Sequence, residues 1–312
     1  MTNTLENQII NENCLNILPK IKSNSVHLIL SDIPYGIGVD DWDVLHDNTN
    51  SAFLGTSPAQ RKAGAIFKKR GKPLNGWSEA DKNISKQYYD WCGSWVKEWL
   101  RILKPGGSAI VFAGRRLAHR CISSFEDIGF TYKDMICWHK EKAPHRAQRV
   151  SVIFDKRNDI YNSEKFQGWR VGNLRPVFEP ILWFVKPYKI GGTIADNMIE
   201  NEVGSYNESA FLKYVSAPNN IIQISSTTQD TGLHPTQKPL KLMQALIELT
   251  TSKQQVVVDP FMGSGTTIIA AASLERKYIG IELNKEYYDT TVNRLTRFNK
   301  LKNDDLFKTV NI

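Results

Sequence analysis

The amino-acid sequence predicts an α/β fold in which a mostly parallel sheet carries helices on both faces. Short apolar runs alternate along the chain with stretches of helical periodicity, which is typical of parallel strands joined by helical crossovers. Two of the apolar runs end in polar turns of the kind that form ligand sites at the carboxyl edge of such a sheet. The chain has 312 residues, which is enough for one large domain of this class.

Seven apolar runs have the length and composition of strands. In chain order they are Gln8–Asn11, Val26–Ser31, Ser108–Ala113, Lys133–Trp138, Pro180–Val185, Val256–Asp259 and Tyr278–Glu282. A long amphipathic helix is expected over Ile84–Leu103, with an aromatic stripe that faces the core. The run Lys104-Pro105-Gly106-Gly107 should end that helix and turn into the next strand.

Two segments depart from this alternation. Residues 40–83 are rich in Asn, Ser, Gly and Lys, and we expect them to form a mobile basic insertion. Residues 187–233 are irregular and slightly acidic. Strand-like runs of the same sheet lie on both sides of each segment, so we expect a single catalytic domain over residues 1–312.

The positive charge of the chain is concentrated in two windows. The net charge is +8. Residues 61–72 contribute +6 and residues 140–175 contribute +5, so the rest of the chain is slightly acidic. Such local charge is expected of a groove that follows a phosphate backbone, although two solvated basic loops would have the same composition.

Composition also excludes several classes of protein. No apolar stretch approaches the roughly 20 residues that span a bilayer, and the N-terminus lacks the plan of a signal peptide, so we expect a cytoplasmic protein with no membrane partner. The four cysteines are widely spaced and form no C-x-x-C pair. We therefore expect neither a disulfide framework nor a metal site.

The clearest ligand signal follows the strand Val256–Asp259. An acidic residue is followed there by a turn with two glycines, Gly263 and Gly265, and then by a helix start. Glycine lets a ligand approach the backbone, and the helix start offers free amide groups. Glu282 ends the next strand, 19 positions after Gly263, where a carboxylate can accept ribose hydroxyls. The third glycine of the dinucleotide motif is replaced by Ile268, and no P-loop lysine is present, so adenosine without pyrophosphate fits best.

This segment resembles the S-adenosylmethionine-binding motif of DNA amino-methyltransferases. His234-Pro235-Thr236-Gln237-Lys238-Pro239 is similar to the motif that holds the methionine end of the cofactor in that family. The resemblance implies a Rossmann-like methyltransferase fold with a seven-stranded sheet and S-adenosyl-L-methionine as cofactor. The residues that it places at the cofactor are Asn13, His234, Thr236, Gln237, Lys238, Asp259, Phe261, Met262, Gly263, Ser264, Gly265, Thr266 and Glu282.

The strand Val26–Ser31 ends in the candidate catalytic segment, Asp32-Ile33-Pro34-Tyr35. The exocyclic amine of a base is a poor nucleophile, and acceptors aimed at its N–H groups stabilise the positive charge that develops on nitrogen. Asp32 and the Ile33 carbonyl can be those acceptors, Pro34 fixes the backbone, and Tyr35 offers a face to an extruded base. The segment is similar to the family's Asp-Pro-Pro-Tyr motif, with Ile33 in place of the first proline.

The order of motifs, catalytic first and cofactor glycines last, resembles the circularly permuted beta group of this family. The runs at 103–107, 138–140 and 175–183 are similar to its intervening motifs. Asn13 stands where that group usually has an aspartate. By the same resemblance, residues 187–233 are the candidate target-recognition region.

An acidic first residue resembles the adenine-N6 enzymes, because the cytosine-N4 enzymes usually place serine there; Ser31 lies one position early. The Pro-Cys nucleophile of enzymes that methylate a cytosine carbon is missing. We therefore expect methylation of adenine N6 in flipped-out DNA bases, with cytosine N4 as the alternative. A protein or RNA methyltransferase is a further alternative, which the order of motifs disfavours. A non-catalytic DNA-binding regulator is another, which the intact cofactor and catalytic motifs disfavour.

DNA is the expected partner, and a cognate restriction endonuclease and a homodimer are left open. The residues expected to hold the DNA backbone are Lys68, Lys69, Arg70, Lys140, Arg146, Arg149, Arg170 and Arg175.

Overall fold

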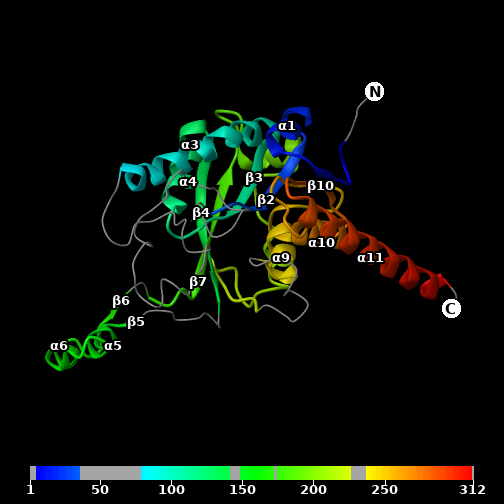
Figure 1. Ribbon diagram of the computed structural model, residues 1–312. Coiled ribbons are helices and arrows are strands. Elements are labelled where there is room, and N and C mark those ends of the chain that lie inside the picture. Colours follow the sequence, from blue (N-terminus) through cyan, green and yellow to red (C-terminus); the bar gives the residue numbers. More distant parts are fainter. Residues whose placement is uncertain (1–4, 36–78, 141–147, 172–173, 226–236, 311–312) are drawn as a thin grey trace.

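The protein is built around one twisted sheet with helices on both sides (Figure 1). The computed structural model describes residues 5–35, 79–140, 148–171, 174–225 and 237–310. The order of strands across the sheet is β1 (Gln8–Asn11), β10 (Lys277–Glu282), β9 (Val256–Asp259), β2 (Val26–Asp32), β3 (Leu103–Phe112), β7 (Phe178–Val185), β4 (Thr131–His139) and β8 (Ile221–Ile222). Neighbouring strands are parallel except where β7 pairs with β3 and β4.

All seven predicted strands are present, but the expected number of strands is wrong, because the sheet has eight. The added strand, β8, has only two residues, which pair with Cys137 and Trp138 of β4. A two-residue strand is too short to show an alternating pattern in the sequence. It brings the chain back to the carboxyl end of β4.

Alternate residues of the central strands pack on opposite faces, as the pleat requires. Ile29 of β2 faces the core under α1 (Cys14–Ile17), α3 (Glu79–Ile102) and α4 (Ala118–Ile128). Its neighbours Leu28 and Leu30 face the core under α9 (Leu240–Thr250) and α10 (Thr266–Ser273). The last helix, α11 (Lys285–Val310), packs beside α10 and β10. The prediction of helices on both faces is therefore confirmed.

The aromatic stripe of α3 is core, as predicted. Trp95 and Trp99 are buried, with ring centroids 4.5 Å apart, and both pack against Phe125 of α4. Trp95 also contacts Phe261 of the glycine-rich turn, at 5.5 Å between centroids. The helix therefore supports one wall of the cofactor region.

Two predicted boundaries are wrong at the ends of α3. The helix begins at Glu79, so residues 79–83 are helical rather than part of the insertion expected over 40–83; residues 40–78 lie outside the described residues. At the other end, Leu103 and the expected turn 104–107 belong to β3. Gly106 keeps the positive φ of a turn, at +82°, and the register with β2 shifts between Val26 and Leu28, so the strand begins with an irregularity.

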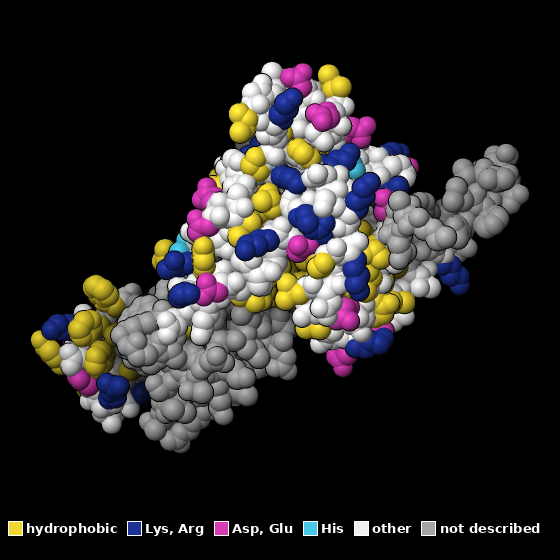
Figure 2. Space-filling model, turned by 90° about the horizontal axis from the view of Figure 1, so that it is seen from above, with side chains coloured by type: hydrophobic (Ala, Val, Ile, Leu, Met, Phe, Trp, Pro, Cys, Tyr) yellow, Lys and Arg dark blue, Asp and Glu magenta, His cyan; other side chains and the backbone are white. Residues whose placement is uncertain are grey.

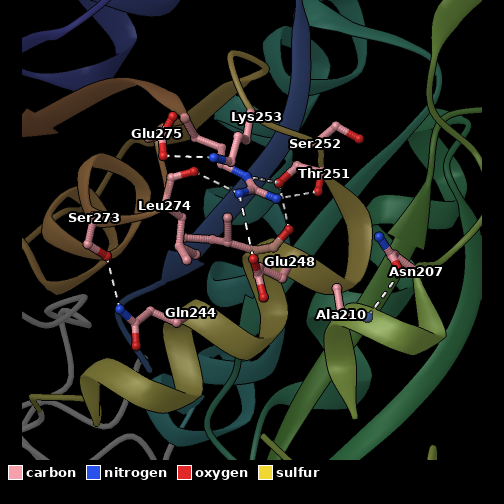
Figure 3. Close-up of polar contacts among 12 residues, drawn as sticks. Asn207, Ala210, Gln244, Glu248, Thr251, Ser252, Lys253, Ser273, Leu274 and Glu275 are labelled. Carbon is pink, nitrogen blue, oxygen red and sulfur yellow. Dashed lines mark hydrogen bonds and ion pairs between the residues drawn. The ribbon is translucent and has the colours of Figure 1, made fainter. Parts of the chain in front are cut away.

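Helices α9 and α10 are joined by buried polar contacts. Figure 3 shows Gln244 of α9 donating to Ser273 of α10, at 2.9 Å. Arg276, which follows α10, donates to the carbonyl oxygens of Thr251 at 2.6 Å and Leu274 at 2.7 Å. These bonds join the middle and the C-terminal end of α9 to the C-terminal end of α10.

Helices and strands that the sequence analysis did not predict occur in two parts of the chain. Within residues 187–225 the chain forms α7 (Ile194–Asn201) and α8 (Glu208–Phe211). Between β4 and β7 it forms β5 (Gln148–Arg149), α5 (Val150–Asp155), α6 (Ile160–Lys165) and β6 (Arg170–Val171), which project away from the body of the protein (Figure 1). Among the helices described, none has the length and apolar character needed to cross a bilayer.

Candidate active site

A cavity of about 450 Å³ lies at the carboxyl ends of β2, β9 and β10. Its wall includes Asp32 and Pro34 from the predicted catalytic segment and residues 259–264 from the glycine-rich turn. Asn13, Gln237, Lys238 and Glu282 line it as well. The structure thus brings together five separate parts of the chain, at the edge of the sheet where the sequence predicted them.

Asp32 ends β2, and its carboxylate contacts Lys238 and Tyr35. The ammonium group of Lys238 lies 2.5 Å from Oδ2 of Asp32, and the hydroxyl of Tyr35 lies 2.9 Å from Oδ1. Lys238 is 4% exposed, and its Nζ atom also donates to the Tyr35 oxygen at 3.0 Å. The family resemblance placed Lys238 at the methionine end of the cofactor; it lines the cavity, and its ammonium group contacts the carboxylate of Asp32.

Glu179 is the centre of the same cluster and was not among the predicted site residues. Its Oε1 atom lies 2.5 Å from the Tyr35 hydroxyl oxygen and 3.2 Å from Lys238, so Asp32 and Glu179 compete for the single proton of that hydroxyl. Its Oε2 atom accepts Lys140, from the end of β4. Glu179 comes to this position because β7 is inserted antiparallel between β3 and β4. The signal in the sequence was that Glu179 lies in the run 175–183, which resembles a motif of the family, directly before the predicted strand.

The charges of this cluster offset one another. Burial raises the pKa of Asp32, Lys238 opposes that rise, and the charge of Glu179 adds to it. Burial also favours the neutral form of Glu179, but Lys238 and Lys140 together outweigh it and lower the pKa of Glu179 to about 2. Burial disfavours the charged form of Lys238, but Asp32 and Glu179 outweigh that effect and raise its pKa. Lys238 and Glu179 are therefore an ionised pair, and they lie beside Asp32, whose carboxylate takes up a proton at higher pH than an exposed aspartate does.

The catalytic elbow is rigid even though Ile33 replaces a proline. The side chain of Ile33 is 1% exposed and packs in the core with α3. The hydroxyl of Tyr88 donates to the carbonyl oxygen of Pro34 at 2.8 Å. Gly114 leaves room for Tyr35, because a Cβ atom at that position would lie 2.8 Å from the Tyr35 Cβ atom. Burial and one hydrogen bond thus provide the restraint that a second proline would add.

Both glycines of the glycine-rich turn have a backbone conformation that other residues rarely adopt. Gly263 has a φ of +51° and Gly265 a φ of +78°, in the left-handed region that favours glycine. Gly265 begins α10, and a Cβ atom there would lie 2.3 Å from Cγ2 of Thr291. Asp259 orders the start of the turn by accepting the Phe261 amide at 3.1 Å.

The cavity wall suits S-adenosylmethionine. Glu282 accepts the Gly263 amide at 2.9 Å and the Asn284 amide at 2.7 Å, which aims its carboxylate at the cavity, and burial raises its pKa. The buried side-chain amide of Gln237 has no hydrogen-bond partner among the described residues, so the wall offers a donor and an acceptor to a ligand. Asn13 caps α1 by accepting the Leu15 amide, and it lines the cavity.

The remaining predicted site residues are placed as follows. Met262, Ser264 and Thr266 line the cavity, whereas His234 and Thr236 lie outside the described residues, as do Lys68, Lys69, Arg70 and Arg146. Lys140 is paired with Glu179 and is 34% exposed. Arg149 and Arg170 lie on the projecting strands β5 and β6, and Arg175 is exposed shortly before β7.

Comparison with known proteins agrees with this geometry. The family model described as DNA methylase, of the N6/N4 type, matches residues 26–293. The type II methyltransferase M.HindIII of Haemophilus influenzae is 55% identical over 292 residues, which cover 92% of this chain and 94% of that protein. The type II methyltransferase M.HpaI of Haemophilus parainfluenzae is 24% identical and is covered over 74% of its length, by 93% of this chain.

Solved structures have the same fold. The PvuII DNA methyltransferase, described as cytosine-N4-specific, superposes with a TM-score of 0.58 at 19% identity, over 91% of this chain and 84% of that one. The M1.HpyAVI–S-adenosylmethionine complex superposes with a TM-score of 0.54 at 24% identity, over 92% of this chain and 98% of that one. The chain therefore belongs to the N6/N4 family of DNA methyltransferases, and S-adenosylmethionine is its methyl donor.

Proposed function

We propose that the protein transfers a methyl group to the N6 amine of a flipped-out adenine in DNA. The observation that carries the proposal is the placement of Asp32 at the cavity wall, with its carboxylate held by Lys238 and Tyr35. Bound S-adenosylmethionine supplies a methyl group made electrophilic by the sulfonium. Asp32 and the Ile33 carbonyl accept the two N–H groups of the target amine, which stabilises the charge that nitrogen gains.

The surroundings of Ser31 support adenine rather than cytosine as the target. Ser31 is 0% exposed, and its hydroxyl donates to Oδ1 of Asp259 at 2.7 Å. It is therefore engaged behind the glycine-rich turn, whereas Asp32 reaches the cavity. Methylation of cytosine N4 is the second candidate, since the two classes share this fold and these motifs.

The test is methylation of plasmid DNA in vitro, followed by mass spectrometry of the nucleosides. We expect N6-methyladenine from the wild-type protein and no methylated nucleoside from the Asp32→Ala variant, with unchanged binding of S-adenosylmethionine. N4-methylcytosine as the sole product would overturn the adenine assignment.

We also infer that the basic residues grip the DNA backbone. Arg149, Arg170 and Arg175 are exposed, and Arg146 lies in the same basic window of the sequence. Neutralising Arg146 and Arg149 together is expected to weaken DNA binding and to lessen its dependence on salt. Unchanged affinity and salt slope in the double alanine variant would remove these residues from the interface.

The relatives named above are type II methyltransferases, which supports a role as the modification half of a restriction–modification system in the cytoplasm. DNA modified by the protein should then resist one restriction endonuclease that cuts unmodified DNA. Digestion of modified and unmodified plasmid with a panel of endonucleases tests this, and cleavage of both plasmids by every enzyme contradicts it.

A further inference from the structure

The projecting segment, residues 148–171, is rooted at the catalytic edge of the sheet. Asp32 pairs with Phe112 at the carboxyl ends of the parallel strands β2 and β3. Strand β4 runs in the same direction, because both β3 and β4 are antiparallel to β7. The chain therefore leaves β4 at His139 on the same edge as Asp32. It re-enters the sheet at Phe178, the register partner of His139.

This segment, which we call the projecting module, has little core of its own. Its base is a two-residue ribbon in which Gln148 pairs with Val171 and Arg149 pairs with Arg170. Phe154 and Phe166 stack between its helices, with ring centroids 5.6 Å apart. Neither helix contains a buried residue. A structure of this kind serves to present its surface rather than to support the fold.

The surface of the projecting module combines exposed apolar side chains with cations. Ile160 is 72% exposed, Tyr161 71% and Trp169 66%. The module has five basic and three acidic residues, and hydrophobic and basic side chains share its surface at the left of Figure 2. Arg149 and Arg170 are register partners on the ribbon, so these two basic side chains leave the same face of it. Aromatic side chains beside arginines are the usual means of contacting both bases and phosphates.

The described part of the region expected to recognise the target lies mainly at the other edge of the sheet. Asn197 of α7 donates to the carbonyl oxygen of Pro105 at 3.1 Å, at the start of β3. The Asn207 amide, just before α8, donates to Leu249 near the end of α9, at 2.8 Å. Pro105 and Phe112 are separated by roughly 23 Å of strand, at about 3.3 Å per residue. Residues 193–211 are thus far from the edge at which Asp32 lies.

We propose that the projecting module binds double-stranded DNA next to the target base and contributes the contacts that α7 and α8 cannot make. The inference rests on the proposed function, because it takes DNA as the partner. Arg149 and Arg170 contact phosphates, while Ile160, Tyr161 and Trp169 contact sugars and base edges. Since the module begins and ends beside the catalytic edge, one duplex can lie against it while a base from that duplex enters the cavity.

The experiment compares two pairs of substitutions of the same residue types. Ile160→Ala with Tyr161→Ala alters the projecting module, and Ile199→Ala with Tyr206→Ala alters exposed residues near the other edge, where Ile199 is 84% and Tyr206 48% exposed. Trp169→Ala is a third variant. DNA affinity is measured by fluorescence anisotropy with a duplex that carries a site mapped in plasmid DNA methylated by the wild type. Binding of S-adenosylmethionine is measured by calorimetry as a test of folding.

We expect the module variants to bind DNA about tenfold more weakly, with binding of S-adenosylmethionine unchanged, and the α7-side pair to bind as the wild type does. Loss of DNA affinity in the α7-side pair alone overturns the inference. It is also overturned if the module variants change only the mass of the protein in light scattering, because the patch is then an interface between copies of the chain. Failure of this inference can be told from failure of the proposed function, because the proposed function fails only if the wild-type protein methylates no DNA.

Discussion

The Nζ atom of Lys238 lies 2.5 Å from Oδ2 of Asp32, although the two residues are 206 positions apart in the chain. Strand β2 brings the carboxylate, and the segment before α9 brings the ammonium group. This contact joins the cofactor motif at Gln237-Lys238 to the catalytic motif. The charge of the Asp32 carboxylate therefore depends on a residue that the family resemblance placed at the cofactor and that lines the same cavity.

Replacement of Lys238 by methionine should impair both stability and catalysis. Asp32 and Glu179 would then share a buried site without the ammonium group that pairs with both, which is expected to cost about 3–5 kcal/mol of unfolding free energy. Lys238 holds down the pKa of Asp32, so that pKa should rise further in the variant. Thermal unfolding and the pH profile of kcat measure the two effects, and the acidic limb should move to higher pH. Lys241→Met, at an exposed position of α9, is the control; an unchanged acidic limb in Lys238→Met would contradict the role.

Glu179 is expected to act as a positioning residue for Tyr35 and Lys238. Glu179→Gln keeps the shape of the side chain but removes the charge that binds Lys140 and Lys238, so kcat should fall about tenfold or more while KM for S-adenosylmethionine stays the same. In the double variant Glu179→Gln with Lys140→Met, the loss of kcat, expressed as free energy, should be smaller than the sum of the losses in the two single variants, because both substitutions remove the same ion pair. Additive losses in steady-state kinetics would show that Lys140 and Glu179 act separately.

Asp259 should make stability depend on pH. Burial raises the pKa of Asp259 to about 7, above the ordinary value of 3.8 that the unfolded chain would have. The folded state then keeps a proton that the unfolded state releases, so stability falls as pH rises from about 4 to about 7 and is level above that. The expected loss is about 4 kcal/mol. Thermal unfolding measures the stability at pH 5 and at pH 8. The loss of stability between these two pH values should be smaller for Asp259→Asn than for the wild type. Asp155→Asn, at an exposed site, should show the same loss as the wild type.

Gly265→Ala should disrupt the cofactor turn. The substitution combines a φ of +78° with a clash against Thr291, 2.3 Å from the new Cβ atom. Gly191 has the same φ but nothing within 4 Å of such an atom, so Gly191→Ala isolates the backbone cost, which is about 1 kcal/mol. We expect a loss about 2 kcal/mol larger for Gly265→Ala, together with lost binding of S-adenosylmethionine in calorimetry. Equal losses of stability in the two variants would rule out the clash.

The sequence predicts the seven longer strands because each is a buried apolar run bounded by turn residues. It also predicts that the turns after β2, β9 and β10 lie together around one cavity, since the carboxyl ends of parallel strands share one edge of the sheet. The role of Glu179 could not be predicted, because it depends on β7 entering the sheet antiparallel between β3 and β4. Nothing in the local sequence around Glu179 specifies that order of strands.

The short helices were missed for a different reason. Helices α5 and α6 have six residues each, which is too short for a helical apolar period to be detected in the sequence. Helix α7 did carry a signal, since Thr193 and Asp196 form a capping box with spacing typical of a helix start. Lys238 was assigned by motif alone, and only the folded chain places its ammonium group on Asp32.

The pairing of His139 with Phe178 has a consequence for how specificity can change during evolution. The chain leaves the sheet and returns to it at a single rung of one antiparallel ladder. The entropy of closing such an excursion grows only slowly with its length. Related enzymes can therefore exchange, lengthen or shorten this part of the chain without moving Asp32, Glu179 or the cofactor turn, and so acquire new recognition sequences on an unchanged catalytic centre.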